Sequence, residues 1–224
     1  MLKALDVLVL DIETTCTADS EVMERIAAKV KPPATMSVPA TIAKWEREKK
    51  PDAIKEAISR TALGGAYGQI VAIGYGVISG GEEQSVRVET SRDEKSLLYD
   101  LMSTPVDHGC FPKLVGHHIV GFDIPFIRQR CIVNGIKIAH WFPRDPKPWS
   151  DTICDTMVAW AGARDTISLS ELAFVLSIEV AETISGAEVP QAWAAGDFED
   201  VLAHCSEDVR VTREIYKRIV AAGL

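Results

Sequence analysis

The sequence predicts an α/β fold, with a mixed β-sheet flanked by helices and a helical insertion at 17–62 after the first strand. One observation is a continuous apolar run at 5–13, typical of a central strand buried on both faces. Another is that strand patterns later alternate with helical ones, an order typical of a mixed sheet. The third is size. With 224 residues, 47% of them hydrophobic, the chain can bury one large core, so 1–224 is expected to form a single domain.

Local patterns place the individual elements. The insertion carries two helical patterns, at 18–30 and 39–58. A hairpin is expected at 69–90, because Gly80-Gly81 can supply the positive φ of its turn. A Ser-Leu-Ser-Glu capping box at 168–171 opens a later helix. The other expected elements, in order, are a helix at 92–102, a strand at 113–120, a helix from Asp123, a loop at 140–150, a segment at 151–162 leading into a helix, and a long helix capped by Asp197 and ending near 221.

Composition limits the class of protein. No run reaches the roughly 18 apolar residues of a membrane helix, and Asp6 and Asp11 lie where a signal peptide is uncharged. The five cysteines are spread along the chain without a C-x-x-C pair, which argues against a disulfide framework or a zinc knuckle. We therefore expect a cytoplasmic protein that does not contact membranes.

The charge is distributed unevenly along the chain. The formal net charge is −8, which by itself disfavours binding to nucleic acid. Residues 29–60, however, carry eight Lys and Arg against four Asp and Glu, a net +4 that leaves −12 for the rest. This pattern fits a basic patch beside a carboxylate-rich site, and it fits equally a solvated helix with alternating charges.

The first strand ends on two carboxylates, in the stretch "VLVLDIETTC" at 7–16. Asp11 and Glu13 are two residues apart, so in a strand their side chains share one face while Ile12 points to the opposite layer. Like charges this close repel each other unless a cation lies between them. Two interpretations remain: a metal site, or two solvated acids at a strand end.

Two further acids lie in helical contexts. Asp123 follows an apolar strand and a Gly-Phe bend at the start of a helix, where an N-cap role also explains it. His204 and Asp208 are four residues apart, which on a helix stacks them on one face, although a surface pair has the same spacing. Apolar residues flank this face and place Asp208 at a buried rim, whereas Glu207 is expected to face solvent.

Together these motifs resemble the 3′–5′ exonucleases of the DEDD superfamily, whose fold is similar to that of ribonuclease H. D-x-E ends the first strand, F-D opens a mid-chain helix, and H-x-x-x-D lies in the last helix. The strings "YGQIVAIGYGV" and "GHHIVGFDIPFIRQR" look most like the proofreading exonucleases related to family B DNA polymerases. Each motif alone is common by chance. The resemblance depends on four acids in matching local context, in order over nearly the whole chain.

The resemblance implies a set of ligands and a reaction. Asp11, Glu13, Asp123 and Asp208 would bind two Mg²⁺ or Mn²⁺ ions, hard cations that take oxygen ligands. Two such ions activate a water and stabilise the leaving 3′ oxygen in an in-line attack. His204 would complete the catalytic set as general base.

The resemblance also implies substrate contacts, with two departures from the family pattern. Thr14 occupies the place where such enzymes hold the terminal nucleotide, and Phe122 would stack on a base, although core packing explains Phe122 equally well. Family members usually have Asn where this chain has His118, which with His117 could donate to phosphate. Members with three residues before the final Asp usually carry Tyr, so His204 either accepts a proton from water or only orients it.

The expected activity is the metal-dependent removal of nucleotides from single-stranded DNA 3′ ends. No polymerase domain is expected within 224 residues, so a role in proofreading or repair would be in trans. An exoribonuclease is one alternative, because nothing in the sequence reads the 2′-hydroxyl. The other is a non-catalytic nucleic-acid-binding module with the same fold. The four acids argue against such a module, because carboxylates repel phosphate.

Overall fold

The computed structural model describes residues 7–104, 111–147 and 150–224, and it contains the mixed sheet that the sequence predicts. Within these residues the sheet has six strands: Val7–Thr15 (β1), Gln69–Ser79 (β2), Glu82–Glu83 (β3), Arg87–Thr90 (β4), Lys113–Gly116 (β5) and Ile153–Asp155 (β6). Their order is β3-β2-β1-β5-β6, with β4 also paired to β2. β1 pairs with β2 on one side (antiparallel) and with β5 on the other (parallel), so it is a central strand. This arrangement is consistent with a ribonuclease H-like exonuclease fold.

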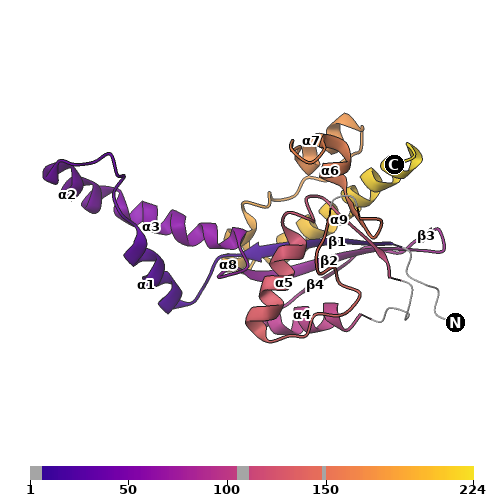
Figure 1. Cartoon of the computed structure of the whole chain (residues 1–224), viewed down its shortest axis with the longest axis horizontal. Coiled ribbons are helices and arrows are strands. Elements are labelled where there is room, and N and C mark those ends of the chain that lie inside the picture. Colours follow the sequence, from indigo (N-terminus) through magenta and orange to yellow (C-terminus); the bar gives the residue numbers. More distant parts are fainter. Residues whose placement is uncertain (1–6, 105–110, 148–149) are drawn as a thin grey trace.

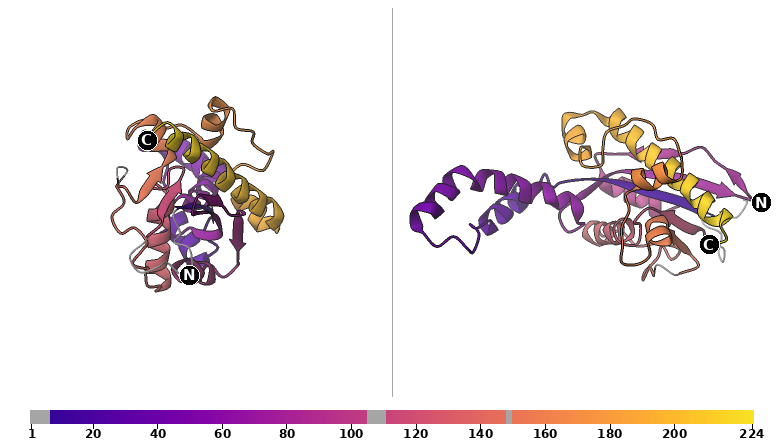
Figure 2. Two further views of the ribbon diagram at one scale, coloured as in Figure 1. Left: turned by 90° about the vertical axis from the view of Figure 1, so that its right-hand side faces the viewer. Right: turned by 90° about the horizontal axis from the view of Figure 1, so that it is seen from above.

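Helices cover both faces of the sheet (Figure 1; Figure 2). Two of them, α4 and α5, pack on one face, and the long α9 crosses the other. None of the helices in the described stretches has the length and apolar content needed to cross a bilayer. Their bounds are Glu94–Met102 (α4), Asp123–Asn134 (α5), Thr156–Ala161 (α6), Leu169–Val175 (α7), Val189–Ala195 (α8) and Phe198–Ala221 (α9).

The two faces of β1 are both apolar for most of its length, which explains the continuous hydrophobic run. Its even-numbered apolar residues pack into the core formed with α4 and α5. Val7 and Val9 point the other way and pack with Val209 of α9. Because side chains alternate along a strand, Asp11 and Glu13 continue the row that faces α9.

Three α-helices lie between β1 and β2 and project from the end of β1 away from the sheet (Figure 1; Figure 2, right). We call residues 17–62 the helical arm. Its base is fastened to the sheet by the Thr14 hydroxyl, which donates to the Ala62 carbonyl at 2.8 Å, and by Thr17 N, which donates to Thr61 Oγ1 at 2.9 Å. Its elements are Ser20–Lys29 (α1), Pro39–Glu48 (α2), Lys50–Ser59 (α3) and the 3₁₀ turn Arg60–Leu63 (η1).

The structure corrects two element boundaries. The helix expected at 39–58 is divided at Lys49, because Pro51 has no N–H for a helical ladder and is accommodated in the first turn of α3. The strand expected at 113–120 ends at Gly116, and the chain then turns toward α5 with His118 at a φ of 62°.

The turn and cap predictions had mixed outcomes. Gly80 and Gly81 have φ values of 59° and 79°, which confirms the hairpin turn. Ser168 Oγ accepts a hydrogen bond from Glu171 N at 3.2 Å, so the capping-box serine is confirmed. Asp197 occupies the N-cap position of α9, as predicted, but its side chain makes no cap hydrogen bond. The four cysteines within the described stretches are free, and Cys110 lies outside them.

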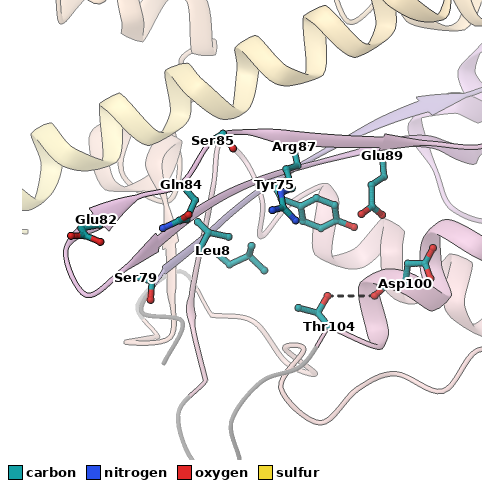
Figure 3. Close-up of a pocket in the computed structure, with 11 residues that line it drawn as sticks. Leu8, Tyr75, Ser79, Glu82, Gln84, Ser85, Arg87, Glu89, Asp100 and Thr104 are labelled. Atoms are coloured by element: carbon teal, nitrogen blue, oxygen red, sulfur yellow. Dashed lines mark hydrogen bonds between the residues drawn. The ribbon is translucent and has the colours of Figure 1, made fainter. Parts of the chain in front are cut away.

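A cavity of about 570 Å³ lies on the α4 side of the sheet (Figure 3). Leu8, Tyr75 and Val77 form its sheet wall, and burial raises the pKa of the Tyr75 hydroxyl. None of the acids at the end of β1 lines it, because they point to the opposite face. The acids that the sequence marks as a possible metal site therefore lie on the α9 side of the sheet, not in this cavity.

Candidate nuclease site

Asp11 and Glu13 lie side by side near the end of β1, on the face that α9 covers. Immediately beyond them, between Glu13 and Thr14, the β1–β2 register shifts, so that Val71 of β2 has no partner on β1. Such bulges re-aim side chains and are frequent next to active sites. The pair of carboxylates therefore stands where regular strand pairing is interrupted.

A glycine allows α9 to approach these carboxylates closely. Gly74 of β2 is the strand partner of Asp11. A Cβ atom at Gly74 would lie 2.6 Å from Val209 Cγ2 and 2.8 Å from Cys205 Sγ, both on α9. Because Gly74 has no side chain, Cys205 Sγ can donate a hydrogen bond to Asp11 Oδ2 at 3.5 Å.

Asp123 joins the site from the first turn of α5. Its Oδ1 accepts a hydrogen bond from the backbone N of Ile12 at 3.2 Å, so the carboxylate lies against the β1 segment between Asp11 and Glu13. The N-cap position belongs to Phe122, and Asp123 is already helical. The N-cap interpretation of Asp123 is therefore wrong, because Phe122 is the N-cap and the Asp123 carboxylate accepts a hydrogen bond from β1.

His204 and Asp208 share one face of α9, as their spacing predicts. His204 Nε2 lies 3.6 Å from Glu13 Oε1 and 3.8 Å from Asp208 Oδ2. Glu207 does not face solvent as expected: it is buried, accepts a hydrogen bond from Ala181 N, and pairs with Arg210. The segment before α8 covers that side of α9, a long-range contact that helical periodicity could not predict.

The electrostatics of the cluster are unfavourable without a cation. Burial raises the pKa values of Asp11 and Glu13 well above the usual carboxyl range, and the neighbouring carboxylates raise them further. Burial also raises the pKa of Asp123 to about 7, although its backbone hydrogen bonds oppose this. The pKa of Asp208 is raised by burial and lowered by His204. Ionising all four groups is therefore costly in the metal-free protein.

The donor set fits hard divalent cations. Ligand atoms of Asp11, Glu13 and Cys205 lie within 4.8 Å of one another. In the described ranges, no Lys or Arg side chain lies within 4 Å of the four carboxylates. His204 is the one basic side chain there that lies so close. Carboxylate oxygens are the ligands that Mg²⁺ and Mn²⁺ prefer, and such ions would offset the repulsion.

The three residues suggested for substrate contact have different surroundings. Thr14 is nearly buried, and its hydroxyl is engaged with Ala62. His118 is exposed at the turn before α5. Phe122 is half-buried, with its ring centroid 5.5 Å from that of Phe126, and it packs against the main core. His118 is therefore the most accessible of the three.

A family model described as a predicted 3′–5′ exonuclease related to the exonuclease domain of PolB matches residues 63–222. The chain belongs to this exonuclease family. Among curated proteins, none matches the chain. The family assignment confirms the resemblance that the motifs indicated.

The family match includes Asp123, His204 and Asp208 but begins after β1 and the arm. Asp11 and Glu13 therefore lie outside the matched span. β1 pairs with β2 and β5, which both lie inside the matched span. This pairing brings Asp11 and Glu13 close to Asp123 and Asp208.

Asp155 supports the candidate site, although no sequence motif pointed to it. Its buried carboxylate accepts hydrogen bonds from the backbone N of His118 and of Val120, both at 3.0 Å. It also caps α6 by accepting from Met157 N and Val158 N. The Asp-Thr-Met sequence before a helical pattern is an N-cap signal that could have identified the cap. The hydrogen bonds from His118 N and Val120 N, in the turn that leads to Asp123, arise from tertiary packing, so no local pattern predicts them.

Proposed function

We propose that the protein removes nucleotides one at a time from the 3′ ends of single-stranded DNA, with two Mg²⁺ or Mn²⁺ ions bound. The observation that supports this most strongly is the gathering of four carboxylates from β1, α5 and α9, two of them beside the His204 imidazole, in a chain of this exonuclease family. A module that only binds nucleic acid gains nothing from buried carboxylates that repel phosphate.

The proposed reaction is hydrolysis of the terminal phosphodiester. Asp11, Glu13, Asp123 and Asp208 would hold the ions, which when bound supply Lewis acidity for the attacking water and the leaving oxygen. The water oxygen bonds to phosphorus, and the bond from phosphorus to the 3′ oxygen breaks. In this proposal His204 Nε2 takes the proton of the water, and the leaving 3′ oxygen gains a proton from solvent.

The geometry leaves room for these groups. His204 Nε2 lies 3.6 Å from Glu13 Oε1 and 3.8 Å from Asp208 Oδ2, beyond hydrogen-bond distance of both, so neither carboxylate engages this nitrogen directly. A cavity of about 340 Å³ adjoins His204 and Asp208 and is bounded by α7, α9 and residues 180–186. Space is therefore available beside His204 and Asp208.

The decisive experiment uses 5′-labelled DNA and RNA oligonucleotides with Mg²⁺, with Mn²⁺ and with EDTA. We expect a descending ladder on DNA with either ion and none in EDTA. Asp208→Asn should abolish the ladder, because it removes a charge from the site without changing the volume of the side chain. Asp100→Asn, at the cavity on the α4 side, is the matched control and should cleave as the parent does.

The alternative functions give different results in the same assay. A ladder on RNA alone would assign the chain as an exoribonuclease. Retention of DNA in a gel-shift assay without cleavage under any condition would overturn the proposal in favour of a binding module.

A further inference from the structure

His204 has a second set of contacts, on the side of its ring that faces away from the carboxylates. Thr183 lies in the segment between α7 and α8, and its Oγ1 is 3.3 Å from His204 Nδ1. The same hydroxyl is 3.2 Å from the backbone carbonyl of Ile184. Among the described residues, the Thr183 hydroxyl is the group within hydrogen-bond distance of the His204 ring. The other ring nitrogen, Nε2, lies beyond 3.5 Å from both carboxylates.

The chemistry of these three groups links the direction of the Thr183 hydroxyl to the tautomer of His204. A hydroxyl has one proton to donate, and the Ile184 carbonyl can only accept. If the Thr183 hydroxyl donates to Ile184 O, its oxygen is left as an acceptor for an N–H on Nδ1. A neutral imidazole protonated on Nδ1 has its lone pair on Nε2, the nitrogen that faces Glu13 and Asp208.

We propose that Thr183 is a positioning residue that holds His204 in the Nδ1-protonated tautomer, with the Nε2 lone pair directed into the carboxylate cluster. This rests on the proposed function in one respect: the tautomer is the one that a proton acceptor at Nε2 requires.

The test compares Thr183→Val, Thr183→Ser and the parent in the full-length chain. Valine has nearly the shape of threonine but lacks the hydroxyl, and serine keeps the hydroxyl. Ser170→Ala is the matched control, because Ser170 lines the same cavity and its hydroxyl contacts Ser168, not His204. The first readout is the pair of imidazole ¹⁵N chemical shifts of His204, measured without metal at a pH well above the ordinary imidazole value of about 6.5.

We expect the parent, Thr183→Ser and Ser170→Ala to show a protonated Nδ1 and an unprotonated Nε2. Thr183→Val should show a mixture of tautomers or the Nε2-protonated form. The second readout is turnover: Thr183→Val should lower kcat roughly 10-fold or more with little change in KM, and Thr183→Ser should restore most of it.

An Nε2-protonated ring in the parent, or unchanged ¹⁵N shifts in Thr183→Val, would overturn the proposal. Unchanged kcat in Thr183→Val would overturn it as well. The ¹⁵N shifts do not depend on activity. If the parent cleaves no substrate but shows the expected shifts, the proposed function fails while the assignment of the tautomer holds.

Discussion

At the scale of single residues, the candidate site concentrates negative charge where the fold can least tolerate it. Glu13 and Asp123 are buried, and Asp11 and Asp208 lie against them in a region without Lys or Arg partners among the described residues. Such an arrangement lowers stability unless a ligand offsets it, as is common where activity and stability compete. The metal-free protein should therefore gain stability when one of these charges is removed.

Asp123→Asn should raise the melting temperature of the metal-free protein above pH 7. The folded-state pKa of Asp123 is about 7, whereas an unfolded Asp has a pKa near 3.9. Between these values the folded state holds a proton that the unfolded state has released, so the free energy of unfolding falls as pH rises. Above pH 7 the loss is complete, and Asn, which is never charged, avoids it.

Thermal melts in EDTA at pH 5 and pH 8 check this prediction. We expect the advantage of Asp123→Asn to be larger at pH 8, where each kcal/mol corresponds to a rise of roughly 2–4 °C for a chain of this size. Added Mg²⁺ should stabilise the parent more than the variant, because the variant has lost a proposed ligand. An Asn variant that is less stable than the parent at both pH values would contradict the electrostatic account.

At the scale of elements, the approach of α9 to the sheet decides whether the acids meet. Gly74 and Gly76 of β2 both face Val209, and a Cβ on either would lie 3.0 Å or less from that side chain. The two glycines let α9 pack close to β1, which brings Cys205 and Asp208 toward Asp11. The glycines of "AIGYGV" are thus part of the architecture of the site.

Gly74→Ala should impair both stability and cleavage. The new methyl group would displace Val209 and Cys205, and overpacking of this kind costs about 1–3 kcal/mol. Turnover should fall with it, because α9 carries His204 and Asp208. Adding Val209→Ala makes room for the methyl group, so the double variant should recover part of both losses.

Thermal melts and ladder assays on the single and double variants measure the two effects. Gly64→Ala is the matched control, because its Cβ would meet nothing within 4 Å and its φ of −152° suits any residue. If Gly74→Ala melts and cleaves as the parent does, the close approach of α9 is not needed for the site.

The sequence predicted those parts of the fold and site that depend on local pattern. Period-2 alternation placed Asp11 and Glu13 on one face, and helical spacing stacked His204 over Asp208. It could not predict that Asp123 binds Ile12 N, that Glu207 is covered by Ala181, or that Thr183 reaches His204. These contacts join residues 21 to 111 positions apart, so they follow from tertiary packing rather than from any local signal.

At the scale of the whole molecule, an acidic body carries a helical arm that is rooted beside the candidate site (Figure 1). Several of the cations of the arm are already paired: Lys44 and Arg47 with Glu48, and Arg60 with Glu56. Lys49, Lys50 and Lys55 form no ion pair with any described residue. Because α1 and α2 both contact α3, the arm can present these lysines as one unit.

If the arm guides the substrate strand, replacing Lys49, Lys50 and Lys55 by Ala should weaken binding of single-stranded DNA and flatten its salt dependence. Each lost phosphate contact should reduce the slope of log K against log salt concentration by about 0.7.

Lys44→Ala, Arg47→Ala and Arg60→Ala together are the matched control. They remove the same charge from the same arm, but each of these cations forms an ion pair with Glu48 or Glu56, so their effect on the slope should be smaller. Equal slopes for the parent and the Lys49, Lys50 and Lys55 variant would mean that these lysines only solvate the surface of the arm. Fluorescence anisotropy of a labelled oligonucleotide in EDTA, at several salt concentrations, separates this binding contribution from cleavage, because the strand stays intact without a divalent ion.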